Sequence, residues 1–213
     1  MTKLFLIRHG ETTWNEAQRF QGQIDVPLNR RGWDQAQYLA ERFADESIDA
    51  IYASDLHRAL DTAQVIAQRV NKPVIIERRL REACLGELQG KRYAEVHARW
   101  FRGIATTPCY FVDDAPLGVE SLRELQARLM QAVQDIVARH RHEQVLIVTH
   151  GACLRAMFCA WLGMELATYW KLSFDSGSVS AADLNDETAR VVLLNDTIHL
   201  NAQGVQTIEV SHG

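Results

Sequence analysis

The feature that most limits how this chain can fold is an uninterrupted run of apolar residues at 145–148, followed at once by threonine and histidine. Successive side chains of a strand point to opposite faces of its sheet, so such a run predicts a strand that is covered on both faces, as at the centre of a parallel sheet. Shorter runs at residues 4–7, 49–54 and 74–76 predict three further strands. A sheet of this kind needs helices on both of its faces.

Apolar residues at helical spacing supply those helices. The two clearest stripes consist of Ala36, Leu39, Ala40 and Phe43, and of Ala59, Ala63, Ile66 and Val70. The longest helix is expected to begin at Ser121, because Glu124 three residues later completes a capping box. Residues 152–162 are apolar nearly all round and predict a buried helix, and residues 92–103 predict another.

Strands and helices alternate along the chain, and a hairpin formed by residues 178–184 and 189–194 follows them. This order is typical of an α/β fold with three layers, α/β/α, around a mainly parallel sheet. The length of 213 residues suits a single domain, so we expect one domain over residues 1–213.

Composition excludes several classes of protein. The formal net charge of −4 argues against a nucleic-acid binder, which usually has a basic excess. No segment approaches the roughly 20 apolar residues of a membrane span. The four cysteines form no C-x-x-C pair, so reduced thiols in a cytoplasmic protein are expected. We therefore predict no nucleic-acid or membrane partner, and a symmetric homodimer is the default assembly.

Polar residues follow the predicted strands where the strands end. Arg8 and His9 follow the first strand, Arg58 comes shortly after the second, and His150 follows the strand at 145–149. Ligands of such sheets bind beyond the carboxyl ends of the strands, and Glu82 joins this edge from the loop after the third strand. Arginines present a fork of donors that matches phosphate oxygens. We see no carboxylate cluster for a metal ion, so neither metal nor cofactor is expected.

Each of these residues also has an ordinary structural explanation. An arginine at a strand end is usually a solvated charge, and a histidine after an apolar strand is usually a buried hydrogen-bonding group. Glu82 follows Arg79 and Arg81 closely in the sequence and fits one half of a surface ion pair. Their convergence at one edge of the sheet favours a common site. The five remaining histidines beyond position 90, apart from His150, have no partner that the sequence identifies.

The motifs together resemble those of the histidine phosphatase superfamily, which includes the cofactor-dependent phosphoglycerate mutases. The opening motif is Arg8-His9-Gly10-Glu11-Thr12, and the last is Val148-Thr149-His150-Gly151. Between them, segments 14–15, 20–28, 54–63, 80–90 and 118–121 match the superfamily's motifs in the same order. The resemblance covers nearly the whole chain and implies a phosphoglycerate mutase-like fold.

The resemblance also implies roles for individual residues. His9 is the expected nucleophile, with a hydrogen bond at Nδ1 that fixes its tautomer. Arg8, Arg58 and His150 are expected to hold the phosphoryl oxygens. Glu82 is expected to protonate the leaving alcohol and then to activate water. The residues expected to contact substrate around them are Asn15, Gln21, Gly22 and Gly151.

Three functions remain open at this point. A metal-independent phosphomonoesterase with a phosphohistidine intermediate is favoured over a phosphoglycerate mutase, because Leu85 and Tyr93 stand where the mutases have a tyrosine and a lysine. A binding module without activity is least favoured, because His9, Glu82 and His150 are all present. The substrate is expected to be a small phosphorylated metabolite, such as a ribazole phosphate or a sugar phosphate.

Three further features of the sequence lie near the motifs. The aromatic residues of the 92–120 region predict an apolar wall for the leaving group: Trp100, Phe101, Tyr110 and Phe111. Serine stands at position 176, where the superfamily commonly has asparagine. Cys84 and Cys153 lie near the motifs and are interpreted as packing residues.

Overall fold

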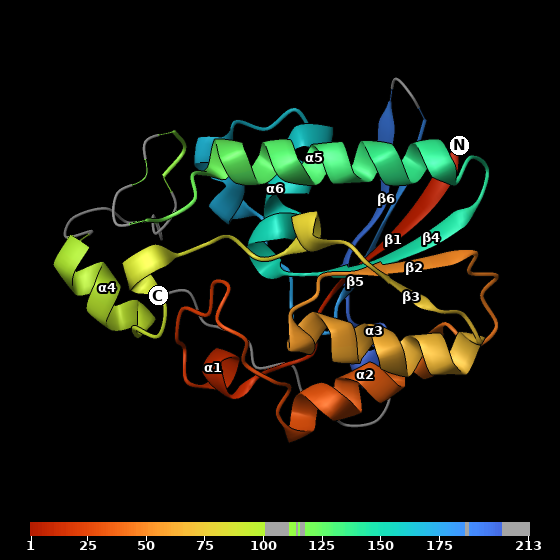
Figure 1. The fold of residues 1–213 in the computed structure, drawn as a ribbon, viewed down its shortest axis with the longest axis horizontal. Helices are drawn as coiled ribbons and strands as arrows, with labels where there is room; N and C mark the ends of the chain where they lie inside the picture. The colour runs from red at the N-terminus through yellow and green to blue at the C-terminus, as the bar shows by residue number, and fades with distance from the viewer. Residues whose placement is uncertain (101–110, 114, 116–117, 186–187, 202–213) are drawn as a thin grey trace.

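A six-stranded sheet forms the centre of the protein (Figure 1). The computed structural model describes residues 1–100, 111–113, 115, 118–185 and 188–201. The strand order is β3-β2-β4-β1-β5-β6. The strands are β1 (Thr2–Arg8), β2 (Ala50–Ala53), β3 (Val74–Ile76), β4 (Gln144–Thr149), β5 (Val179–Leu184) and β6 (Ala189–Asp196). The first four are parallel, and β5 pairs antiparallel with both β1 and β6, so the expected mainly parallel sheet with a late hairpin is confirmed.

Helices cover both faces of this sheet. In Figure 1, α5 (Leu122–Arg139) and α6 (Gly151–Trp161) lie on one side, while α2 (Arg30–Arg42) and α3 (His57–Val70) lie on the other. Each pair closes a separate hydrophobic core against the sheet. The remaining helices are short: α1 (Thr13–Glu16), α4 (Tyr93–Trp100), α7 (Ile198–Asn201) and three 3-10 turns at Arg78–Leu80, Gly86–Leu88 and Leu166–Lys171.

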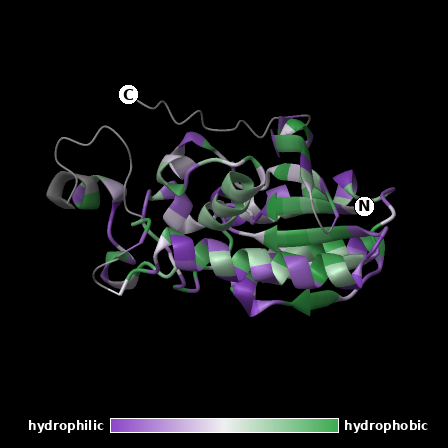
Figure 2. Cartoon of the chain, turned by 90° about the horizontal axis from the view of Figure 1, so that it is seen from above, coloured by the Kyte–Doolittle hydropathy of each residue, from purple (hydrophilic) through white to green (hydrophobic). Residues whose placement is uncertain are grey.

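Strand β4 occupies the position that its apolar run predicts. It lies between β2 and β1, and its residues from Val145 to Thr149 are all buried. In Figure 2 the strands are coloured mostly as hydrophobic, whereas the helices carry both hydrophilic and hydrophobic residues. Because β1 and β4 are parallel neighbours, their carboxyl ends lie side by side.

The predicted capping box at the start of α5 is present. The Ser121 hydroxyl accepts the Glu124 N–H at 3.2 Å, and the Glu124 carboxylate accepts the Ser121 N–H at 2.9 Å. This cap fixes where the longest helix begins, and its buried stripe places the helix along the sheet. The helix expected at 92–103 is found as α4, and the rest of the aromatic region lies mostly outside the described residues. Within the described part of the chain, no helix has both the length and the apolar character needed to cross a bilayer.

We predict that the central strand is far less tolerant of truncation than the sheet edge. Ile147→Ala in β4 should lower the free energy of unfolding by about 2–5 kcal/mol, because a fully buried side chain leaves a cavity. Ile76→Ala in edge strand β3 is the matched control, and the 53% exposed side chain there should cost about 1 kcal/mol or less. Urea unfolding measures both variants, and equal losses would contradict this account.

Candidate active site

The carboxyl ends of three neighbouring strands bring the predicted site residues together. Arg8 is the last residue of β1 and His9 follows it. His150 follows β4 and is the residue immediately before α6. The His9 N–H donates to the Thr149 carbonyl at 3.0 Å, which joins the two strand ends. Arg58 is the second residue of α3, after β2. The rings of His9 and His150 lie 5.1 Å apart between centroids.

His9 is held as a neutral imidazole in one tautomer. Its Nδ1 lies 2.6 Å from the Gly10 carbonyl oxygen. A carbonyl oxygen only accepts hydrogen bonds, so Nδ1 carries the proton and Nε2 keeps its lone pair. Burial, together with the charges of Arg58 and Arg8, holds the pKa of His9 well below its usual range. The predicted hydrogen bond at Nδ1 is therefore confirmed.

Three side chains next to His9 have buried nitrogens without a hydrogen-bond partner among the described residues. These are Nε of Arg8, Nε of Arg58, and both ring nitrogens of His150. Burial lowers the pKa of Arg8 and lowers the pKa of Arg58 to about 10. An arginine starts from so high a pKa that both guanidinium groups still carry their charge at neutral pH. Buried polar groups are normally paired, so this cluster is suited to an anion.

Main-chain carbonyls hold the two arginines in place. Arg58 donates to the carbonyls of Gly22 at 2.7 Å and Ile24 at 2.9 Å, and Arg8 donates to the Phe174 carbonyl at 2.5 Å. Gly22 has φ +53°, and an added Cβ would lie 2.3 Å from the Gln89 Oε1. A larger residue at position 22 would therefore displace the loop that orients Arg58.

The loop after β1 presents amide groups at the same edge. The Thr12 N–H donates to Asn15 Oδ1 at 3.1 Å, and the single proton of the Thr12 hydroxyl can be donated to Gln21 Oε1 at 3.0 Å. Because Thr12 supplies one donor to each amide oxygen, the amide NH₂ groups are left to donate elsewhere. Gly151 opens α6 close to Arg8, whose Nε would lie 3.5 Å from a Cβ added to this glycine. Direct contact of Asn15, Gln21 and Gly151 with a ligand stays a prediction.

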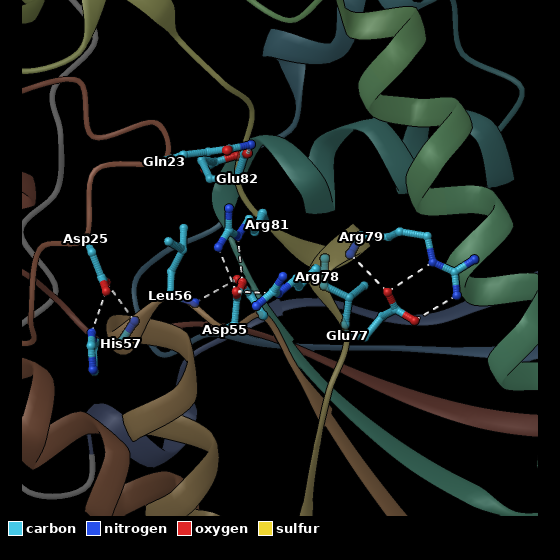
Figure 3. Close-up of polar contacts among 12 residues, drawn as sticks. Gln23, Asp25, Asp55, Leu56, His57, Glu77, Arg78, Arg79, Arg81 and Glu82 are labelled. Atoms are coloured by element: carbon cyan, nitrogen blue, oxygen red, sulfur yellow. Dashed lines mark hydrogen bonds and ion pairs between the residues drawn. The ribbon is translucent and has the colours of Figure 1, made fainter.

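Glu82 reaches this site from the segment after β3. One carboxylate oxygen accepts the Ala83 N–H at 2.9 Å, and the other accepts the Ala152 N–H of the first turn of α6 at 3.3 Å. The Cys153 thiol lies 3.7 Å from the same carboxylate, and burial raises the pKa of this thiol. Figure 3 shows Gln23 beside Glu82, and the Gln23 amide donates to the Glu82 carbonyl at 3.0 Å. Among the described residues, the Glu82 carboxylate is therefore held by main-chain N–H groups and not by a surface ion pair with a neighbouring arginine.

The sequence analysis noted Ser176 but did not predict that the loop at Gly177 holds the main chain at the end of β1. The Gly177 N–H contacts the Arg8 and His9 carbonyls at 3.0 and 3.2 Å, and Gly177 has φ +75°. His199, to which the sequence assigned no partner, contacts the Gly177 carbonyl through Nε2 at 3.0 Å and Arg42 through Nδ1 at 2.9 Å. Arg42 can only donate, so Nδ1 accepts and Nε2 donates, as in a neutral ring. Burial, with the charge of Arg42, lowers the pKa of His199 to about 4.

His140 is a second histidine for which the structure supplies partners. Its Nε2 lies 2.9 Å from the Tyr52 hydroxyl, and its Nδ1 lies 2.7 Å from the Glu143 carboxylate. These contacts join the end of α5 to β2, beside the amino end of β4, so they belong to the scaffold. No periodicity or motif marks this pairing in the sequence.

The proposed aromatic wall is only partly described. Phe111 packs against the larger hydrophobic core, while Phe101, Tyr110 and the side chain of Trp100 lie outside the described residues. Tyr93 packs on Phe20 with ring centroids 4.4 Å apart. Leu85, at the other position where the chain departs from the mutases, is fully buried in the core.

Comparisons with known proteins agree with this architecture. A family model of the histidine phosphatase superfamily (branch 1) matches residues 4–197. Phosphoserine phosphatase 1 of Hydrogenobacter thermophilus is 36% identical over 203 residues, covering 94% of this chain and 95% of that protein. A probable phosphoglycerate mutase GpmB of Proteus mirabilis is 35% identical over 190 residues, covering 86% and 85%. The structure of Bacillus stearothermophilus YhfR superposes with a TM-score of 0.84 at 35% identity, covering 94% and 100%.

The buried neutral histidines predict a loss of stability in acid. Unfolded histidines bind a proton near pH 6.5, whereas His9, His150 and His199 stay neutral in the fold because their pKa values are lowered. The unfolded state therefore binds more protons, and the free energy of unfolding should fall as pH decreases from about 6.5 toward 4. His199→Gln keeps both hydrogen bonds without titrating, so it should lose on the order of 1–2 kcal/mol less over this window.

Urea unfolding at pH 7 and pH 5 measures this difference. Exposed His142 is a matched control, and His142→Gln should retain the pH dependence of the unmodified protein. An unchanged pH dependence in His199→Gln would contradict the inferred neutral state of His199.

Proposed function

We propose that this chain hydrolyses a small phosphomonoester through a phosphohistidine formed on His9. The chain belongs to the histidine phosphatase superfamily (branch 1), and its similarity to phosphatases of that superfamily makes it a phosphatase. The observation that carries this proposal is the set of unpartnered, buried nitrogens of Arg8, Arg58 and His150 around a neutral His9. Such a site places donors for an anion beside a nucleophile.

The first chemical step forms a bond between His9 and phosphorus. The Nε2 lone pair attacks the phosphorus in line with the bond to the leaving oxygen, and that bond breaks. The contact between Nδ1 and the Gly10 carbonyl supports this step, because it stabilises positive charge on the ring as the bond forms. The lowered pKa of His9 keeps its lone pair free at neutral pH.

The charge of the phosphoryl group is balanced by the protein. A phosphomonoester carries nearly two negative charges at pH 7. Arg58 supplies a positive charge that is already buried, partly buried Arg8 supplies a second, and His150 adds a ring N–H. Preorganised charges of this kind stabilise the transition state without reorganisation, so we propose that the reaction needs no metal ion.

Glu82 is the proposed general acid and base. In the first step its carboxyl proton moves to the leaving alkoxide, which departs as the alcohol. In the second step the Glu82 carboxylate takes a proton from water, the water oxygen attacks phosphorus, and the bond to His9 Nε2 breaks. Inorganic phosphate leaves, and both residues return to their starting states.

The substrate that we propose is the phosphate ester of a small alkyl alcohol, and phosphoserine is the first one to test. The similarity to a phosphoserine phosphatase of nearly equal length supports this class. Buried Leu85 and half-exposed Tyr93 stand where the mutases have a tyrosine and a lysine, which favours hydrolysis over mutase action.

His9→Ala should reduce hydrolysis of phosphoserine and of 4-nitrophenyl phosphate by about 1,000-fold or more, because no other residue would form the intermediate. Phosphate release measured in excess EDTA should be undiminished in the unmodified protein. Acid-free quenching and mass spectrometry should find one phosphoryl group on the peptide that contains His9. The exposed His142 provides a matched control, and His142→Ala should keep full activity.

The same assay separates the other candidates. Conversion of 3-phosphoglycerate with 2,3-bisphosphoglycerate, faster than release of phosphate, would identify a mutase, as the similarity to GpmB suggests. Saturable phosphate binding without turnover of any ester would identify a binding module. Activity that survives in His9→Ala would overturn the proposed intermediate.

A further inference from the structure

We propose that Arg128 of α5, acting with Glu120, is a positioning residue that holds Glu82 at the leaving-group oxygen. This inference rests on the proposed function, in which Glu82 protonates the leaving alcohol. Arg128 does not reach the substrate in this proposal. It acts on the main chain of the segment that carries the acid.

The Arg128 guanidinium contacts this segment at two carbonyls. Nη1 donates to the Arg79 carbonyl at 2.6 Å, and Nη2 donates to the Glu82 carbonyl at 3.1 Å. The side chain is 22% exposed and reaches the segment from a helix anchored in the larger core. A planar fork that spans two carbonyls fixes both the place and the direction of the chain between them.

Glu120 completes the clamp from the turn before α5. Its carboxylate accepts Nε of Arg128 at 2.6 Å and Nη2 at 2.8 Å, a bidentate ion pair. The same carboxylate accepts the Cys84 N–H at 3.1 Å. Although burial acts to lower the pKa of Arg128, the bonds to Glu120 raise it, so the guanidinium stays charged. The clamp thus contacts the main chain on both sides of Glu82.

Other residues also hold the segment. The Thr149 hydroxyl donates to the Leu80 carbonyl at 2.8 Å, and ion pairs hold the side chains of the segment (Figure 3). Arg81 forms a bidentate pair with Asp55, at 2.7 Å for each bond, and Arg79 reaches Asp135 of α5 at 2.7 Å. These pairs fix the residues before Glu82. Within the described part of the chain, the hydrogen bonds to the Glu82 carbonyl itself come from Arg128 and Gln23.

The position of the Glu82 carboxyl depends on this main-chain support. The carboxyl accepts the N–H of Ala83 at 2.9 Å and the N–H of Ala152 in α6 at 3.3 Å. The shorter bond comes from the next residue of the same segment, so a shift of the segment would move the carboxyl with it. A general acid works only within hydrogen-bond reach of the leaving oxygen. A displacement of about 1 Å costs about 100-fold in rate. The clamp therefore affects both steps in which Glu82 acts, activation of water and protonation of the alcohol. Release of the alcohol precedes the attack of water, so kcat/KM reports only protonation of the alcohol.

The choice of substrate isolates that step. An alkoxide leaves poorly without a proton, whereas 4-nitrophenolate is stable enough to leave unprotonated. Arg128→Lys keeps a positive charge but cannot span two carbonyls and the Glu120 carboxylate. We expect it to lower kcat/KM for phosphoserine at least about tenfold more than kcat/KM for 4-nitrophenyl phosphate. Equal losses for both esters would overturn the positioning role.

Three further variants complete the experiment. Glu82→Gln sets the largest expected difference between the two esters. Arg123→Lys is the matched control on the same helix, because Arg123 pairs with exposed Asp113 away from the segment, and it should leave both rates unchanged. If Arg128→Lys does not fold, Glu120→Gln decides by the same ratio.

The outcomes also separate this inference from the proposed function. Turnover of neither ester by the unmodified protein would overturn the proposed function and the positioning role with it. Turnover of both esters, with equal losses in Arg128→Lys, would overturn the positioning role alone.

Discussion

Two charged guanidinium groups, one buried and one partly buried, lie beside two neutral histidines, and the rest of this structure depends on this constraint. Burying such charges is costly unless they are compensated, and main-chain carbonyls of Gly22, Ile24 and Phe174 provide part of that compensation. The Nε groups of both arginines have no partner among the described residues, and an anion would supply one. The loops that supply these carbonyls must therefore be rigid, and much of the polar network around the site serves to fix them.

The sheet supplies the rigidity that these loops need. The order β2-β4-β1 sets three strand ends side by side, and a core on each face holds the strands in register. A shift of one residue in β1 would turn His9 to the opposite face, so the pairing of Arg8 with Thr149 is as important to the site as any side chain in it. The positions of the site residues at the carboxyl edge of the sheet therefore depend on the packing of the two hydrophobic cores.

The sequence predicted most of this arrangement because the informative signals are local. Apolar runs located the strands, helical stripes located α2, α3 and α5, and the rule for strand ends gathered Arg8, His9 and His150. The contacts of Arg128 with Glu82 and of His199 with Gly177 were not predictable in this way, because they join residues far apart in the chain and follow no periodicity. Arg128 looks like any charged residue of an amphipathic helix until the fold brings Glu120 and the acid-bearing segment to it.

The place of β1 in the sheet has a consequence for how the chain acquires activity during synthesis. His9 emerges early, but both neighbours of its strand, β4 and β5, belong to the second half of the chain. The apolar first strand therefore stays unpaired until most of the polypeptide has been synthesised. Pairing between segments so far apart in the chain slows folding. A ribosome-bound chain that stops before β4 would carry the nucleophile without the sheet that aligns it. The edge that holds His9 is therefore complete only after β4 and β5 have paired with β1.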